Sequence, residues 1–162
     1  MTHYRELLGA AKAGGYQWVG FDHGPQAGDL FLRHDVDLSL DAAVEMGQLE
    51  HELGVTATYF IMAESVFYNL DSTAGIATLR ELRRAPPYFV EGQYRSDSNA
   101  NWRESCPHEE LAASTFDWVQ LNVHPVIWMY RGETMRQTMD AMLDAKRAEW
   151  FAYLANDRID LS

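Results

Sequence analysis

Short runs of apolar and β-branched residues alternate with segments of helical periodicity along the 162 residues of this chain. The strand-like runs occupy residues 16–21, 29–37, 55–62, 88–94 and 118–123. The segments with a helical pattern occupy residues 2–13, 40–53, about 72–84, 108–114 and 133–155. Because strands and helices alternate, we predict a single α/β domain, 1–162, with a mainly parallel sheet and flanking helices.

Capping residues place some of the helix ends in this pattern. Ser39 has a preferred N-cap side chain and stands immediately before the segment 40–53. Gly54 follows the same segment, at the position where a left-handed residue commonly ends a helix. Large aromatic residues within the predicted elements are expected in the core: Trp18, Trp118 and Trp150.

Composition and charge exclude several classes of protein. The chain has 24 acidic and 13 basic residues and a net charge of -11, whereas nucleic-acid binding needs clustered basic residues. Its single cysteine, Cys106, allows no intrachain disulfide and favours a reducing compartment. There is no signal-peptide pattern, and no apolar run approaches the roughly 18 to 20 residues of a membrane helix. We therefore expect a soluble cytoplasmic protein with neither a nucleic-acid nor a membrane partner.

Two aspartates close the second strand-like run, in the segment RHDVD at 33–37. Because strand side chains alternate between faces, Asp35 and Asp37 should point one way and His34 the other. Two carboxylates at the carboxyl end of a parallel strand suit a metal ligand beside a general base. They can equally cap a loop or the following helix, with Arg33 as a surface ion pair, and the pattern leaves both interpretations open.

Two further segments carry candidate chemistry. His124 follows the strand-like run 118–123, where an imidazole can exchange a proton near neutral pH, as a general acid must. A core histidine bonded to a backbone carbonyl is the commoner alternative. The polar loop 96–103 holds Trp102, an indole on which a sugar can stack, although a turn anchored by its tryptophan has the same composition.

In this order, the segments resemble a branch of the polysaccharide deacetylase family of the NodB type. The resemblance is carried by residues 31–69 and 87–128, and within them by 33–37, 57–62, 96–98, 102–103 and 124–125. It implies a distorted (β/α) barrel and the removal of acyl groups from amino sugars or related amides. It also implies a divalent metal, usually zinc, held by one aspartate and two histidines.

The resemblance assigns a role to each candidate residue. Asp35 would be the general base, Asp37 a metal ligand and His124 the general acid. The expected substrate-binding residues are Asp97, Trp102, Arg103 and Trp128. The implied substrate is a carbohydrate or a small amide.

The metal ligands depart from the family pattern. The family's two metal histidines lie four residues apart, whereas no two of the six histidines here are three or four apart. We therefore expect His34, His51 or a residue of a partner chain to complete a zinc site with Asp37. The family's Arg-Pro motif, which orients the base, is also missing.

A second departure is an apparent internal deletion near residues 80–87, where several strands and helices of the family are absent. A barrel without consecutive strands is open and exposes sheet edges that can pair with another chain. We therefore expect a smaller open sheet or a homodimer that covers the edge.

The expected function is a metal-dependent deacetylase-like hydrolase. The alternatives are a non-catalytic relative that binds sugar or a protein partner, and a degenerate family member.

Overall fold

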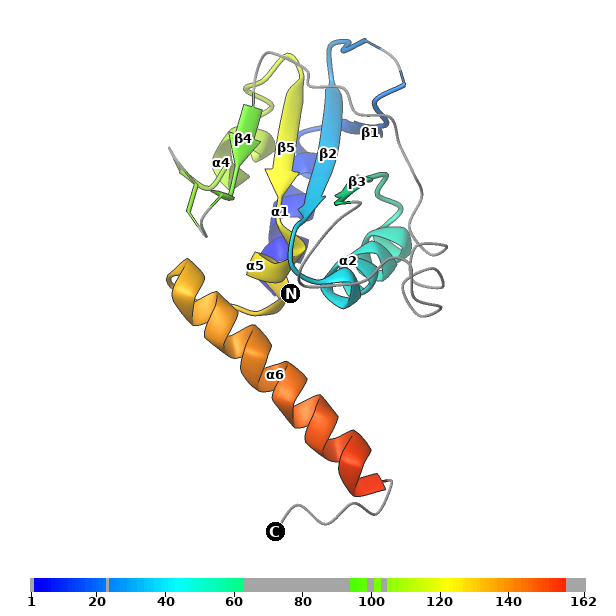
Figure 1. Cartoon of the computed structure of the whole chain (residues 1–162). Helices are drawn as coiled ribbons and strands as arrows, with labels where there is room; N and C mark the ends of the chain where they lie inside the picture. The colour runs from blue at the N-terminus through cyan, green and yellow to red at the C-terminus, as the bar shows by residue number, and fades with distance from the viewer. Residues whose placement is uncertain (1, 23, 63–93, 99–100, 103–104, 157–162) are drawn as a thin grey trace.

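The computed structural model describes residues 2–22, 24–62, 94–98, 101–102 and 105–156 (Figure 1). Within them the helices are α1 (Thr2–Ala13), α2 (Leu40–Leu53), α4 (His108–Ala112), α5 (Pro125–Met129) and α6 (Met135–Asn156). The strands are β1 (Gln17–Val19), β2 (Asp29–Val36), β3 (Thr58–Ile61), β4 (Tyr94–Ser96) and β5 (Val119–Val123). The chain is therefore an α/β protein, as predicted.

Every described strand pair is parallel, which confirms the predicted sheet type. The order across the sheet is β1, β2, β5 and β4, and β3 also pairs with β2. Strand β1 pairs with residues 29–31 of β2 and β3 with residues 33–36, while β5 pairs along the opposite side of β2. A closed barrel is neither shown nor excluded by these strands, so the NodB-like barrel stays a prediction.

The two faces of β2 differ in chemistry because its side chains alternate. On one face, Leu30 and Leu32 are fully buried in the main core with residues of α1, α2 and α4. On the other face, Phe31 packs against other aromatic rings, and Arg33 and Asp35 form an ion pair. The helix-covered face of the sheet therefore forms part of the core. The candidate site residues Arg33 and Asp35 lie on the other face.

Helix α1 covers the sheet through an apolar stripe of helical spacing. Its buried residues, Tyr4, Leu7, Leu8 and Ala11, recur three and four positions apart and so lie on one side of the helix. They meet Leu111 of α4, which is also fully buried. Burying one such leucine side chain contributes roughly 1.5–3 kcal/mol, so this stripe is a main source of the stability of the fold.

The predicted caps of α2 are confirmed. The Ser39 hydroxyl accepts a hydrogen bond from the Ala42 N–H at 3.2 Å. Gly54 has a φ of 68° and donates its N–H to backbone carbonyls of the last turn. The helix thus begins and ends where its local sequence indicates.

Other predicted boundaries shift. Strand β4, Tyr94–Ser96, shares only Tyr94 with the predicted strand 88–94 and continues into the predicted loop. Residues 88–93 and the predicted helix at 72–84 lie outside the described residues. Helix α5 was not predicted. It begins because His124 is extended and Pro125 then occupies the first helical turn, where a proline loses no hydrogen bond.

Helix α6 contacts the rest of the protein mainly through its first half and then extends away from the sheet (Figure 1). Met142 is 5% exposed, but Trp150 is 67% exposed, so the expectation that Trp150 belongs to the core is wrong. No helix among the described residues combines the length and apolar character needed to cross a membrane.

Candidate functional site

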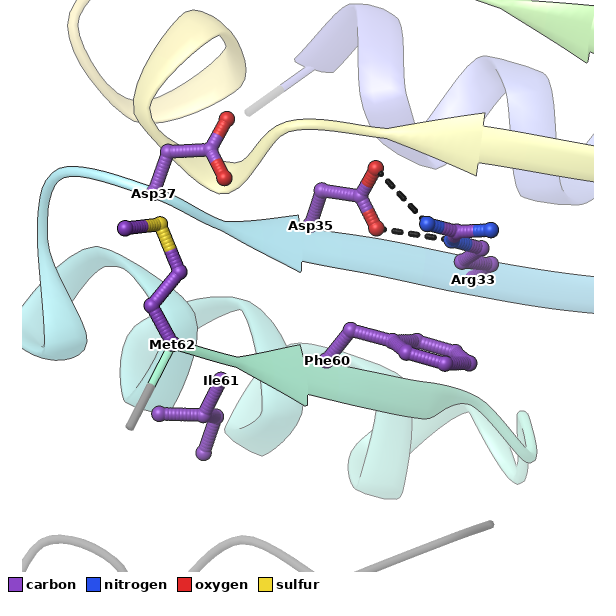
Figure 2. Close-up of a pocket in the computed structure, with 6 residues that line it drawn as sticks. All are labelled: Arg33, Asp35, Asp37, Phe60, Ile61 and Met62. Atoms are coloured by element: carbon purple, nitrogen blue, oxygen red, sulfur yellow. Dashed lines mark hydrogen bonds and ion pairs between the residues drawn. The ribbon is translucent and has the colours of Figure 1, made fainter. Parts of the chain in front are cut away.

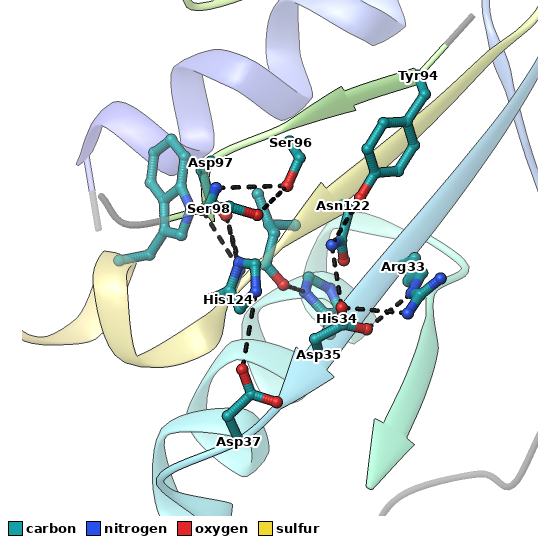
Figure 3. A network of polar contacts seen from close by, with 12 residues as sticks. Arg33, His34, Asp35, Asp37, Tyr94, Ser96, Asp97, Ser98, Asn122 and His124 are labelled. Atoms are coloured by element: carbon teal, nitrogen blue, oxygen red, sulfur yellow. Dashed lines mark hydrogen bonds and ion pairs between the residues drawn. The ribbon is translucent and has the colours of Figure 1, made fainter. Parts of the chain in front are cut away.

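The candidate residues converge at one rim of the sheet, where parallel strands end (Figure 3). Asp35 and Asp37 lie at the end of β2, Asp97 follows β4, and His124 follows β5. Because these strands are parallel, their carboxyl ends meet at the same edge, where ligands bind in many α/β proteins. The aspartate pair and the distant histidine are thus brought together.

The His124 ring is held by Asp97. Its Nδ1 lies 2.6 Å from Asp97 Oδ1, and the His124 backbone N–H also donates to this carboxylate, at 3.1 Å. The Trp128 indole N–H donates to the other oxygen of Asp97 at 2.5 Å. Because Asp97 is only 2% exposed, these contacts are shielded from water and fix the imidazole plane.

The second nitrogen of His124 faces the aspartate pair. Its Nε2 lies 3.8 Å from Asp37 Oδ2, and the Asp37 side chain is about half exposed. Burial on its own lowers the pKa of His124, but the hydrogen bond and charge of Asp97, with the charges of Asp35 and Asp37, raise that pKa above its ordinary value. The imidazolium form therefore persists to a higher pH than in an isolated histidine, as suits a proton donor.

Asp35 is oriented from its own strand and from β5. The Arg33 guanidinium donates to its two oxygens at 2.7 and 3.1 Å, and the Asn122 amide donates to it at 3.0 Å. Arg33 in turn lies over the Phe60 ring, 4.3 Å from its centroid. The Arg33 guanidinium therefore fixes the orientation of the Asp35 carboxylate. In the family that the sequence resembles, an Arg-Pro motif orients the base, and this motif is missing here.

A pocket of about 230 Å³ opens beside these groups (Figure 2). Its polar wall comes from Arg33, Asp35 and Asp37 of the β2 region. Its apolar wall comes from β3 and the residue after it: Phe60, Ile61 and Met62. A small ligand with one polar and one apolar side could contact both walls.

His34 is not brought to the predicted metal position. Its side chain is fully buried on the helix-covered face, with Nε2 2.7 Å from Glu50 Oε1 and Nδ1 3.2 Å from the Val123 carbonyl oxygen. Both ring nitrogens already have partners, and the alternation of β2 points the ring away from Asp37. His34 is therefore assigned to the core rather than to a metal.

His51 does not reach Asp37 either. It is exposed in the last turn of α2, whereas Asp37 precedes the first turn of the same helix. Fourteen helical residues span roughly 20 Å at 1.5 Å per residue, so the two groups lie at opposite ends of α2.

The predicted substrate-binding residues occupy different places. Trp128 is 7% exposed and donates a hydrogen bond to Asp97, and the half-buried Trp102 makes an edge-to-face contact with Trp128, 6.4 Å between ring centroids. Asp97 and Trp128 therefore hold His124 and do not form an open stacking surface. Arg103 lies outside the described residues.

The expected zinc site does not fit the described residues around Asp37. A catalytic zinc normally takes three protein ligands. Here Asp35 is engaged by Arg33, and His34 and His51 point elsewhere. Among the described side chains, the one group of three with ligand atoms within 4.8 Å of one another does not include Asp37. The described residues around Asp37 therefore do not supply the three protein ligands of a catalytic zinc.

Sequence reasoning missed Asn122 as a site residue. It lies in β5, its amide donates to Asp35 at 3.0 Å and to the Tyr94 hydroxyl at 2.9 Å, and it is 2% exposed. A signal was present in the sequence: an asparagine within an apolar strand, two positions before His124. Because strand side chains alternate between faces, residues two positions apart point to the same side of the sheet.

Comparison of the chain with protein-family models, with curated proteins and with solved structures finds no match.

Proposed function

We propose that this protein is a deacetylase-like hydrolase, with Asp35 as general base and His124 as general acid, acting on acylated amino sugars or related amides. One observation carries the proposal. Asp97 holds the His124 ring through Nδ1, while Nε2 is presented to Asp37, beside the pocket that Asp35 and Asp37 line. The resemblance of the RHDVD and His-Pro segments to the polysaccharide deacetylase family supports the substrate class.

The proposed reaction uses the chain's own groups. Asp35 removes a proton from a water molecule, and the water oxygen forms a bond to the acyl carbon. His124 Nε2 then gives its proton to the amide nitrogen as the carbon–nitrogen bond breaks, which leaves a free amine and a carboxylic acid. Each positioned acid or base contributes roughly 10²–10⁴-fold in rate in enzymes of known mechanism.

Asp37 has an electrostatic role in this scheme. Its carboxylate is 3.8 Å from His124 Nε2 and favours the protonated imidazole before transfer. By resemblance it would also be a metal ligand, and a divalent cation there would need further donors from a partner chain or from substrate. The resemblance also supports an incomplete or opened (β/α) barrel. The single cysteine supports a cytoplasmic location, because thiols stay reduced there.

Acetate release from acetylated amino-sugar oligomers tests the proposal, with untagged protein assayed with and without added zinc. We expect release by the unmodified chain and its loss in Asp35→Asn and His124→Ala. Asp117→Asn is the matched control, because Asp117 is exposed just before β5, at the opposite end of that strand from His124. No release by the unmodified chain under either condition, or equal release by all four proteins, contradicts the proposal.

The second candidate is a non-catalytic interaction module. Helix α6 favours it, because it exposes a set of large apolar side chains: Leu143, Trp150, Phe151 and Tyr153. The burial of Trp128 and Asp97 favours a protein partner over sugar stacking in this alternative. Acetate release that depends on His124 would overturn it.

A further inference from the structure

A second group of titratable side chains lies apart from the rim of the sheet, between the starts of α1 and α4. His3 is in the first turn of α1, His108 is the first residue of α4, and Cys106 precedes α4. Cys106 Sγ is 2.8 Å from His108 Nδ1 and 3.8 Å from His3 Nε2. Each of the three residues offers one ligand atom that lies within 4.8 Å of the other two. Residues more than 100 positions apart thus direct two nitrogens and one sulfur toward a common point.

The other nitrogen of each imidazole is already occupied by an acceptor. His3 Nδ1 is 3.2 Å from Glu6 Oε2, and His108 Nε2 is 3.4 Å from the His3 carbonyl oxygen. An imidazole that donates from one nitrogen presents the lone pair of its other nitrogen. Metal-binding histidines almost always have such a carboxylate or carbonyl partner, which sets the tautomer and the ring orientation.

We propose that His3, Cys106 and His108 bind one zinc ion. In a tetrahedral site with zinc–sulfur bonds of about 2.3 Å and zinc–nitrogen bonds of about 2.0–2.1 Å, sulfur and nitrogen ligands stand about 3.5 Å apart. The two sulfur–nitrogen distances here, 2.8 and 3.8 Å, lie on either side of that value, so small side-chain rotations suffice. Two imidazoles and a thiolate favour zinc or cobalt over magnesium or calcium, which prefer oxygen.

The coordination leaves one position for a water molecule. Three protein ligands fill three of the four tetrahedral positions, and the His3 side chain is 41% exposed, so solvent reaches this point. Burial raises the pKa of the Cys106 thiol to about 11, and this proton is released when the thiolate binds the metal.

The site is distinct from the His124 group but adjoins it. The His3 ring stacks on Trp128 at 5.5 Å between centroids and 21° between planes, and Trp128 donates to the Asp97 that holds His124. A bound metal would also join α1 to α4, two helices that pack against each other in the core. Zinc is therefore expected to stabilise the fold.

Cobalt titration of the untagged full chain tests the proposal. We expect one equivalent of Co²⁺ to give the absorption of a tetrahedral site with a thiolate-to-cobalt charge-transfer band, and Zn²⁺ to displace it. Because Cys106 is the only cysteine, this band reports on that residue. The band should vanish in Cys106→Ser, and cobalt affinity should fall about tenfold or more in His3→Ala and in His108→Ala.

Two control variants separate this site from other groups. His51→Ala removes an exposed histidine on α2, and Asp37→Asn alters the rim of the sheet, so both should keep the band. Circular dichroism establishes that each variant folds, and Zn²⁺ should raise the Tm of the unmodified chain but not that of Cys106→Ser. Absence of the band in the unmodified chain overturns the proposal, as does its persistence in both histidine variants or its loss in Asp37→Asn.

Discussion

The Asp97 carboxylate accepts hydrogen bonds from three donors at the base of the candidate site: the His124 ring, the His124 backbone N–H and the Trp128 indole. An asparagine in its place keeps the size but loses the charge that favours the His124 imidazolium. We therefore predict that Asp97→Asn lowers the pKa of His124 and, if the proposed reaction occurs, slows it by roughly 10²–10⁴-fold. An NMR titration of the His124 ring measures the first effect, with Asp117→Asn as control, and an unchanged titration contradicts the assignment.

The same contact has a defined pH dependence. Because the folded protein raises the pKa of His124, this group adds stability that is fully present below the unfolded value of about 6.5. The contribution is lost as the pH rises through the higher folded value. The difference in free energy of unfolding between the unmodified chain and Asp97→Asn should therefore shrink as the pH rises above about 6.5.

Glu50 is a buried acceptor for three donors on the helix-covered face. It is 2% exposed, and it accepts from the Tyr4 hydroxyl, from the Tyr59 hydroxyl at 2.7 Å and from His34 at 2.7 Å. Burial and the Glu50 charge both raise the pKa of Tyr59, so its hydroxyl stays protonated and can donate. The network explains why a carboxylate is stable in this core.

We predict that Glu50→Ala lowers the free energy of unfolding by about 3–5 kcal/mol, because it leaves two hydroxyls and an imidazole buried without their acceptor. Glu45→Ala, on an exposed position of the same helix, should cost under about 0.5 kcal/mol. Urea denaturation of the two variants measures both values. Equal costs would show that the Glu50 network contributes nothing.

At the scale of elements, α2 is defined by its ends. Gly54 has a φ of 68°, and a side-chain Cβ placed there would meet nothing within 4 Å, so only the backbone conformation opposes substitution. We predict that Gly54→Ala costs about 1–2 kcal/mol and Gly54→Asn less, because asparagine enters the left-handed region more readily. Thermal unfolding of the two variants compares them, and an asparagine variant weaker than the alanine variant contradicts this reason.

Helix α6 shows the limit of helical periodicity as a guide to burial. Its stripe of Met135, Met139, Met142 and Trp150 has core-like spacing, yet the buried side chains described in this helix, Thr138 and Met142, lie in its first half. Farther along, Lys146 bonds to Asp41 at the start of α2, and Trp150 beyond it is exposed. Periodicity specifies which side of a helix is apolar, but a neighbouring element must be present to bury that side.

At the scale of the whole molecule, β3 and β4 each pair with a single strand within the described part of the sheet. Together with the exposed apolar side of α6, these strands support the predicted homodimer. We expect light scattering at micromolar concentration to give about 37 kDa, twice the chain mass of 18.5 kDa. A monomeric mass of the unmodified chain contradicts the prediction. If the unmodified chain is a dimer and the Trp150→Ser variant is a monomer, the interface lies on α6 rather than on a sheet edge.

The sequence predicted the α/β class, the parallel sheet and both caps of α2, because these depend on residues close together in the chain. It also placed Asp35, Asp37 and His124 at the carboxyl ends of two predicted strands. Parallel strands end at one edge of a sheet, and the structure has these side chains at the same rim. It did not predict that Asp97 and Trp128 support His124 from below. Their role depends on the register between β4 and β5, which local composition does not encode.

The chain by itself determined where strands and helices form and which side of each is apolar, because φ/ψ preference and periodicity are properties of neighbouring residues. Only the tertiary structure decided the partners of the ionisable groups. It directed His34 to Glu50, 16 residues away, and Asp97 to His124, 27 residues away, and it brought His3 to Cys106, 103 residues away. Such contacts form only when separate elements pack, so they depend on the register and packing of the whole sheet and its helices.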